Sequence, residues 1–256
     1  MKVIPLNSTN ESKFWSYVEH RKEEYFFFIM DLKNYPEYTK IWMAIDENGD
    51  IQGMLLDYKG KNIQIRGSDE AVKKLIGEID LSLKDITILY SQKGLLDRKY
   101  LKDKKEIILN RMLIHPGENI IKSDISSEIL TENDKEELAS LYRKTDPSFW
   151  GHVQGKDLEF DENHKWFGIK RENKIVSFAH IWFGEEFGLI STVGTHPDFR
   201  NSGFATSLVS VAIQELLKHS PLGLIHVRAD NAPAVHTYKK NGFRDFLQFY
   251  FLKSAQ

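Results

Sequence analysis

One stretch constrains this chain more than any other, because a short apolar run at Leu189–Val193 leads through a turn into an amphipathic segment that opens at about Gly203. Lys218 and His219 close that segment and Pro221 follows it, which suits the negative end of a helix dipole. The sequence therefore predicts a strand that feeds directly into a helix. The apolar residues recur with the spacing of one helix face, at Phe204, Leu208, Val211, Ala212, Leu216 and Leu217.

The start of the predicted helix has the features of an anion-binding site. A helix N-terminus leaves several backbone N–H groups without partners and carries the positive end of the dipole, so it attracts phosphate. Arg200 adds a permanent positive charge, Gly203 lets the backbone approach a ligand, and Ala205 permits close packing of the new helix. Thr206 and Ser207 add hydroxyl groups in the first turn. The pattern predicts a turn that binds phosphate.

A second motif follows the first along the chain. Ile225–Asp230 is predicted to be a strand, and a helix of about two turns is predicted after Asn231, with Pro233 in its first turn. The run from Asn241 to Phe243, with Gly242 at its centre, is typical of a left-handed helix stop with an apolar residue after it. The two motifs together predict the order strand, helix, strand, helix.

At these residues the chain resembles a known family. The run from Val193 to Ala205, in which Arg200 precedes Gly203 by three residues and Ala205 by five, resembles the pyrophosphate loop of the GNAT superfamily of N-acetyltransferases. The second motif, which contains Asn231 and Tyr238, resembles the closing helix of the same superfamily and lies at the expected distance. An ordinary strand-turn-helix junction is the alternative for the first motif alone. The resemblance covers about half the chain, from residue 128 to about residue 253.

The resemblance implies that residues 118–256 form an acetyltransferase domain with acetyl-CoA, or another acyl-CoA, as cosubstrate. It implies that the pyrophosphate lies on the loop and that the pantetheine arm lies along the strand before the loop. No metal is expected. The cofactor-binding residues that it implies are Val193, Gly194, Thr195, Arg200, Asn201, Ser202, Gly203, Phe204, Ala205, Thr206 and Asn231.

The resemblance also suggests roles in catalysis. Tyr238 is the candidate catalytic residue, as the proton donor to the departing thiolate, although a packed structural Tyr is the alternative. The backbone N–H of Val193 or Thr195 is the candidate donor to the oxyanion.

The general base is not evident from the sequence. Many family members carry a Glu on the strand before the loop, whereas the strand Leu189–Val193 has no acidic residue. Trp150, His152 and Trp182 are candidates for the wall of an acceptor pocket, with a place in the core as the alternative. The candidate bases, each with a structural role as its alternative, are His180, Glu185, Glu186, His196 and Asp230.

The first half of the chain repeats the predicted order of elements. Asn48-Gly49 in the first half and Glu172 in the second mark equivalent hairpin turns. This order predicts a tandem duplication of one α/β fold, with mixed, mostly antiparallel sheets and flanking helices; two unrelated α/β halves are the alternative. In the first half, strands are expected at residues 3–6, 40–45, 51–58, 62–66, 85–90 and 106–114, and helices at 11–21, 68–79 and 94–102.

The turn-rich segment His115–Asn119 predicts a boundary between domains 1–117 and 118–256. After Ile65 the first half runs through Arg66 and Gly67 straight into the helix that Ser68 caps. No loop with the Arg-x-x-Gly-x-Ala pattern intervenes. The first domain is therefore predicted to be a degenerate copy that lacks the pyrophosphate loop.

Composition narrows the classes of function. The net charge of −2 and a pI near 6.5 give no support for binding to nucleic acid or an anionic membrane. The absence of cysteine excludes disulfides, cysteine nucleophiles and thiolate metal sites. No apolar run is long enough for a signal peptide or a membrane span, so a cytoplasmic protein is expected.

Three classes of function fit these observations. An N-acetyltransferase that acts on a primary amine of a small molecule or peptide is favoured. A noncatalytic acyl-CoA sensor is the second, because the loop is present and a carboxylate base is not. A scaffold that presents a partner surface on its first half is the third. The sequence leaves the acceptor, the acyl-chain length and the oligomeric state open.

Overall fold

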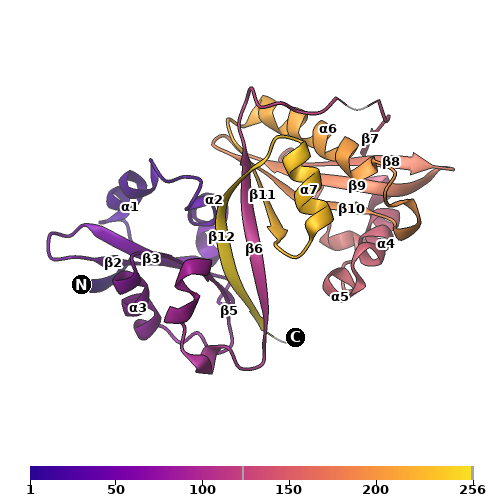
Figure 1. Cartoon of the computed structure of the whole chain (residues 1–256). Helices are drawn as coiled ribbons and strands as arrows, with labels where there is room; N and C mark the ends of the chain where they lie inside the picture. The colour runs from indigo at the N-terminus through magenta and orange to yellow at the C-terminus, as the bar shows by residue number, and fades with distance from the viewer. Residues whose placement is uncertain (123, 255–256) are drawn as a thin grey trace. The chain divides into compact units, whose positions relative to one another are not determined.

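The computed structural model describes residues 1–122 and 124–254 and divides into two compact units (Figure 1). Unit 1 comprises Met1–Leu109 and Leu247–Gln256, and unit 2 comprises Asn110–Phe246. The chain therefore enters unit 2 within one strand, β6, and returns to unit 1 within another, β12. Among the described residues, no helix has the length and apolar character that a membrane crossing requires.

Unit 1 is a mostly antiparallel sheet in the order β1-β2-β3-β4-β5-β12, in which only β4 and β5 pair in parallel. Two of its turns follow directly from the sequence. Gly49 takes a φ of 83° in the β2–β3 turn, and the Oγ of Ser68 accepts a hydrogen bond from the Ala71 N–H at 3.3 Å and caps α3. The elements are β1 Lys2–Pro5, α1 Glu11–Val18, α2 Phe26–Asn34, β2 Thr39–Ile45, β3 Ile51–Tyr58, β4 Asn62–Gly67, α3 Asp69–Glu78, β5 Asp85–Leu89, β6 Lys104–Ile114 and β12 Arg244–Ser254.

The helix predicted at residues 94–102 is wrong. Two short 3-10 segments, Tyr90–Leu95 and Arg98–Tyr100, occupy this part of the chain. The backbone is extended at Leu96 and Asp97, and the Asp97 carboxylate accepts a hydrogen bond from the Lys99 N–H at 3.0 Å. A local Asx turn therefore competes with the helix and interrupts it.

Unit 2 has the sheet order β6-β11-β10-β9-β8-β7, in which β7 to β10 pair antiparallel and β10 and β11 pair in parallel. The hairpin turn predicted at Glu172 is confirmed, with positive φ at Glu172 and Asn173 between the paired strands β8 and β9. The elements are β7 Glu128–Leu130, α4 Lys135–Thr145, α5 Pro147–Trp150, β8 His164–Arg171, β9 Lys174–Phe183, β10 Gly188–Thr195, α6 Phe204–His219, β11 Gly223–Arg228 and α7 Ala232–Lys240. Three 3-10 turns complete the unit: Glu132–Asp134, Gly155–Asp157 and Pro197–Phe199.

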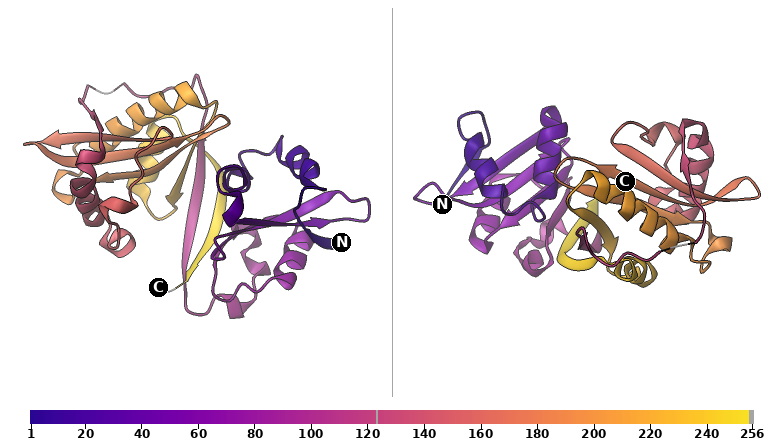
Figure 2. Two further views of the ribbon diagram at one scale, coloured as in Figure 1. Left: turned by 180° about the vertical axis from the view of Figure 1, so that it is seen from behind. Right: turned by 90° about the horizontal axis from the view of Figure 1, so that it is seen from above.

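Helices α6 and α4 cover opposite faces of this sheet (Figure 2). Successive side chains of β9 point to these two faces. Ala179 and Ile181 pack against the buried residues of α6, whereas Phe178 packs against those of α4. The predicted α6 is confirmed, but its buried surface is wider than one stripe. Val209 and Ile213 are fully buried, whereas the predicted Val211 and Leu217 are only partly buried.

The last strand of the chain completes unit 1. Residues Phe249–Leu252 of β12 pair antiparallel with Ile86–Leu89 of β5. The sequence analysis placed this strand in the second domain, because a pairing between residues so far apart leaves no local signal. The domain limits 1–117 and 118–256 stay a prediction about the two repeats, whereas the compact units divide the chain at other residues.

Candidate active site

The parallel pairing between strands β10 and β11 ends at Ile190 and Ile225. Their parallel pairing joins Gly188–Ile190 to Gly223–Ile225, although β10 continues to Thr195 and β11 to Arg228. Over the same residues β10 stays paired with β9 on its other side. From Ser191 onward, β10 therefore has one edge without a strand partner among the described residues. An extended ligand with amide groups can pair with such an edge.

After the unpaired edge of β10, the chain continues through a 3-10 turn to the N-terminus of α6. Gly203 is the N-cap with a φ of 77°, and no side chain caps the helix. Asn201 is also left-handed, with a φ of 63°. In the described chain, the N–H groups of Asn201, Ser202 and Gly203 donate to no acceptor, and the first helical N–H groups have no intrahelical partner. These free donors and the absence of an acidic residue from the first turn fit a pyrophosphate.

The predicted loop residues divide into exposed and anchoring positions. Arg200, Asn201, Ser202 and Gly203 are exposed, and Ala205 and Thr206 are half-buried. Phe204 is buried in the core beneath α6. The Arg200 guanidinium donates to the Thr145 carbonyl at the end of α4 at 2.9 Å, which holds the charge beside the loop.

The three predicted residues of β10 pack tightly on β9. A Cβ on Gly194 would lie 2.6 Å from Cε1 of Phe178 and 2.8 Å from Cγ2 of Thr145. The Thr195 hydroxyl lies 2.8 Å from the hydroxyl of Ser177, and Val193 packs against the cluster under α6. Packing within unit 2 therefore already requires glycine at position 194.

Helix α7 begins and ends as the sequence predicts. The Asn231 side chain accepts a hydrogen bond from the Ala234 N–H at 3.3 Å and caps the helix. Gly242 has a φ of 95°, and the Phe243 N–H donates to the Tyr238 carbonyl at 3.1 Å. The cap engages Asn231 Oδ1, which leaves its amide NH₂ for other partners.

Tyr238 lies in the core with only 7% of its surface exposed. Its ring meets Phe243 edge to face at 6.0 Å, and its hydroxyl makes no hydrogen bond with any described residue. Burial raises the pKa of the Tyr238 phenol above its ordinary value, so the hydroxyl stays protonated at neutral pH. A protonated phenol without a partner is suited by its chemistry to donate a proton.

The structure separates the candidate bases. Glu185 and Glu186 lie before the start of β10, at the end opposite the loop. The Asp230 carboxylate accepts from both arms of Arg228, at 2.9 and 2.7 Å. His196 accepts from the Asp198 N–H at 3.3 Å and caps a 3-10 turn.

His180 is different, because its Nδ1 meets the Ser191 hydroxyl where β10 leaves β11. Burial, with a smaller effect of His164, lowers the pKa of His180 to about 3. The ring is therefore neutral at physiological pH. A group this weakly basic does not serve as the base for an ammonium ion.

The three residues predicted to line an acceptor pocket, Trp150, His152 and Trp182, do not line one pocket together. The Trp150 ring meets Tyr142 edge to face at 4.9 Å, under the end of α4. His152 lines a hollow of about 520 Å³ together with Glu136, whereas Trp182 lies near Phe187 at the far end of β10. Trp182 lies opposite Leu189 of β10, next to the residue where β10 leaves β11, and Trp150 contacts the Tyr142 ring on α4.

Sequence reasoning missed five residues at this site. Ser191 and Thr192 follow the point where the strands part, and Tyr142 lies 2.5 Å from the Thr192 hydroxyl. Asn241 is fully buried and donates to the Thr206 carbonyl at 3.3 Å, and Arg228 lies 4.0 Å from Asp146 at the end of α4. The sequence motifs assign none of these residues a role in the site, because their places in it follow from contacts between different elements.

Comparison with known proteins agrees with this geometry. Residues 135–243 match the family model described as the acetyltransferase (GNAT) family. The second half of this chain contains a GNAT domain. A mycothiol acetyltransferase of Streptomyces bingchenggensis is 29% identical over 105 residues, which are 38% of this chain and 34% of that protein. The chain thus spans about a third of the length of this curated relative.

Solved structures extend the likeness to both units. A Drosophila protein superimposes with a TM-score of 0.69 at 10% identity, covering 99% of this chain and 98% of the other. A tandem GNAT protein from the clavulanic acid biosynthesis pathway gives 0.57 at 10% identity, over 98% and 97%. At this identity the likeness shows the fold alone. The predicted fold class is confirmed: a GNAT fold in the second half and a GNAT-like fold in the first.

Proposed function

We propose that unit 2 is an N-acetyltransferase that moves an acetyl group from acetyl-CoA to a primary amine of a small molecule or peptide. One observation carries the proposal: the unpaired edge of β10 leads through the Pro197–Phe199 turn to the uncapped N-terminus of α6. An extended amide arm joined to a pyrophosphate matches that succession of free backbone groups and free N–H donors. The GNAT match and the acetyltransferase relatives support the same reading.

In this proposal, acetyl-CoA supplies an acetyl thioester that an amine can attack. The loop from Arg200 to Thr206 binds the pyrophosphate, and residues Val193–Thr195 bind the arm. The N–H of Val193 or Thr195 donates to the oxyanion that forms at the carbonyl. The Tyr238 hydroxyl gives its proton to the departing sulfur and regains one, through water, from the nitrogen that becomes the amide.

No carboxylate of β10 takes the proton of the acceptor, because the strand has none. We propose that the amine enters in its neutral form, after losing a proton to water. Holding the two substrates together then supplies much of the rate. Under this proposal the rate rises with pH, because the neutral fraction of the amine rises.

A noncatalytic acyl-CoA sensor is the second candidate, favoured by the absence of an acidic residue from β10. Two measurements on the full chain separate the candidates. Calorimetry with acetyl-CoA tests binding, and release of free CoA thiol in the presence of a panel of primary amines tests transfer. We expect binding and amine-dependent release. Binding without release would support the sensor, and no binding would exclude both. The cytoplasmic location remains a prediction from the sequence.

A further inference from the structure

Strand β10 is irregular at the residue that follows the end of its pairing with β11. The register of β10 on β9 shifts between Ile190, which lies opposite Ile181, and Thr192, which lies opposite His180. Ser191 is therefore an extra residue in the strand, a β-bulge. A bulge re-aims side chains, and bulges are common beside active sites.

The bulge puts two hydroxyl groups on the α4 face of the sheet. The Ser191 hydroxyl meets Nδ1 of His180, and the Thr192 hydroxyl lies 2.5 Å from the hydroxyl of Tyr142 on α4. In a regular strand, consecutive side chains point to opposite faces. Ser191 is also exposed, whereas His180 and Tyr142 are buried. Ser191 can therefore reach a ligand while its partner is fixed.

The His180 ring is held by its neighbours. It stacks on Trp166 at 4.0 Å between ring centroids and an interplanar angle of 18°, and on His164 at 5.3 Å and 13°. His164 is held in turn by Asp161 and Glu159, each at 2.9 Å. The stack fixes the direction of Nδ1, which points to Ser191. Nε2 of His180 is buried and has no hydrogen-bond partner.

The ring stays neutral over the whole physiological range. Burial lowers the pKa of His180 to about 3, with His164 lowering it further and Asp161 opposing the shift. A neutral imidazole has one nitrogen that donates and one that accepts. With the proton on Nε2, Nδ1 accepts the Ser191 O–H. The oxygen of Ser191 then has its lone pairs free to accept from a ligand.

We propose that Ser191 contacts the acceptor, its Oγ accepting a hydrogen bond from the attacking amine, and that His180 is the positioning residue that holds this hydroxyl. The inference rests on the proposed acetyl transfer. It places the amine on the α4 side of the sheet, where β10 leaves β11 and beside the edge proposed for the thioester arm. Neither Ser191 nor His180 takes up a proton in this role.

The test is steady-state kinetics of the full chain with acetyl-CoA and the best amine of the panel. Ser191→Ala should lower kcat/KM for the amine about tenfold, the worth of one hydrogen bond of roughly 1.4 kcal/mol, and leave KM for acetyl-CoA unchanged. His180→Phe removes the acceptor and should have the same effect. His180→Asn puts an amide oxygen in reach of Ser191 and should restore most of the rate.

The double variant distinguishes a hydrogen-bonded pair from two separate effects. If His180 acts through Ser191, Ser191→Ala with His180→Phe should lose about tenfold in all and not about a hundredfold, since coupled residues are not additive. Ser220→Ala is the matched control, because its buried hydroxyl donates to the Gly184 carbonyl at 2.6 Å before the start of β10. It should change only stability.

The outcomes separate this inference from the proposed function. Normal amine kinetics in Ser191→Ala would overturn the inference and leave acetyl transfer standing. Full additivity in the double variant would remove His180 as the positioning residue. A wild-type protein that transfers acetyl to no amine would overturn both. The thermal melts of all variants should stay close to that of the control.

Discussion

The same element of the fold, a helix that follows a strand paired in parallel, begins in two different ways in the two units. In unit 2, α6 begins at an uncapped left-handed Gly203 with no acidic residue in its first turn. In unit 1, α3 begins at Ser68, which caps it, and its first turn carries Asp69 and Glu70. Gln92 also donates to the Asp69 carboxylate at 2.8 Å. The N-terminus of α6 therefore has free N–H donors for an anion, whereas the N-terminus of α3 is capped by Ser68 and carries acidic side chains.

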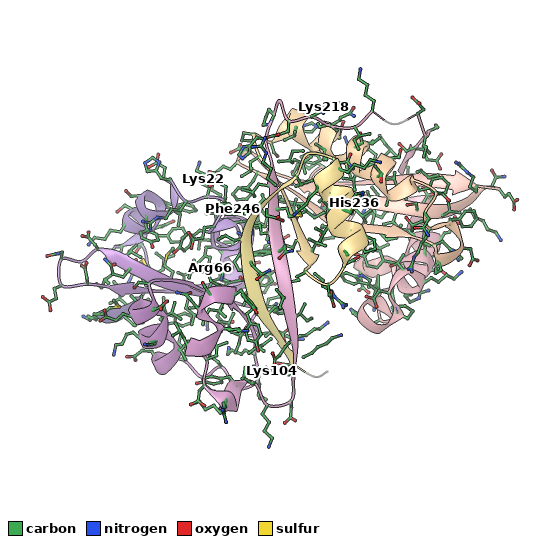
Figure 3. All side chains as sticks on the ribbon, in the orientation of Figure 1. Lys22, Arg66, Lys104, Lys218, His236 and Phe246 are labelled. Atoms are coloured by element: carbon green, nitrogen blue, oxygen red, sulfur yellow. The ribbon has the colours of Figure 1, made fainter. Side chains whose placement is uncertain are left out.

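The strands before these helices differ in the same way: an edge that is free in unit 2 is covered by a side chain in unit 1. Pairing of β4 with β5 joins Asn62–Gln64 to Asp85–Thr87. Beyond it lies Arg66 (Figure 3). Its buried guanidinium donates to the Thr87 carbonyl at 3.3 Å and lies over the Phe249 ring of β12 at 4.2 Å. A side chain of unit 1 therefore lies where unit 2 has a free strand edge. We therefore expect unit 1 to bind no acyl-CoA, because its own side chains already satisfy the corresponding backbone groups.

The largest effect is expected from Gly203→Asn. Asparagine tolerates the left-handed backbone, but its side chain enters the space proposed for the pyrophosphate. We expect a loss of more than about a hundredfold in acetyl-CoA affinity by calorimetry, of the order of removing several charge-assisted hydrogen bonds. Gly60→Asn in unit 1 is the control, because Gly60 has a φ of 67° and open space around it. Equal affinity in the two variants would refute the loop assignment.

The second prediction concerns α7, since unit 1 has 3-10 turns after β5 instead of this helix. Tyr238→Phe should lower single-turnover transfer by about a hundredfold, a typical size for the loss of a general acid. Acetyl-CoA affinity should hardly change, because the phenol acts on the departing sulfur. A normal rate with a lower melting temperature would make Tyr238 a packing residue and leave water as the proton donor.

The third prediction makes the end of α6 resemble that of α3. Thr206→Asp places a carboxylate in the first helical turn, as Asp69 does in unit 1. Acetyl-CoA affinity should fall about tenfold, and less at high salt, because like charges repel. The protein should be equally stable or slightly more so, because an acid suits a helix N-terminus. Weaker binding with a lower melting temperature would indicate misfolding instead.

The last prediction is a pair of opposite pH dependences of stability. In unit 2, burial lowers the pKa of His180 to about 3, so the unfolded chain gains a proton that the folded chain refuses, and stability falls as pH drops from about 6.5 towards 3. In unit 1, burial raises the pKa of Asp31 to about 7, so stability falls as pH rises from about 4 through 7.

Each group should contribute at most about 1.4 kcal/mol per pH unit within its window. Urea unfolding at several pH values measures these slopes. Asp31→Asn should flatten the neutral side and His180→Asn the acid side. If both variants kept the wild-type slopes, these burial effects would not govern the stability of the units.

The sequence predicted the features of the fold that depend on the backbone preferences of a few neighbouring residues. The turns at Gly49 and Glu172, the cap at Ser68 and the stop at Gly242 all follow from residues whose backbone preferences act within a few positions. The Gly94–Lys102 helix was wrong because Asp97 makes a competing local turn. For the site, motif spacing indicated the loop and the two helices, which the fold confirms as elements.

The rest depends on contacts between distant residues. The Ser191 bulge is set by the register of β10 on β9, and the partner of its hydroxyl comes from another strand. The pairing of β12 with β5 joins residues from the two ends of the chain. Arg66 looked like an ordinary strand residue, and its burial against Phe249 follows from that same pairing.

The return of the chain to unit 1 at Leu247 has a consequence for biosynthesis. Strand β5 leaves the ribosome before any residue of unit 2, whereas its partner β12 is translated only after residues Asn110–Phe246. Until then β5 presents a strand edge that invites pairing with other chains. A nascent chain or a truncation that stops before Leu247 therefore leaves unit 1 incomplete, even though nearly every residue of unit 2 is present. Unit 1 therefore depends on a strand that follows the whole of unit 2 in the sequence.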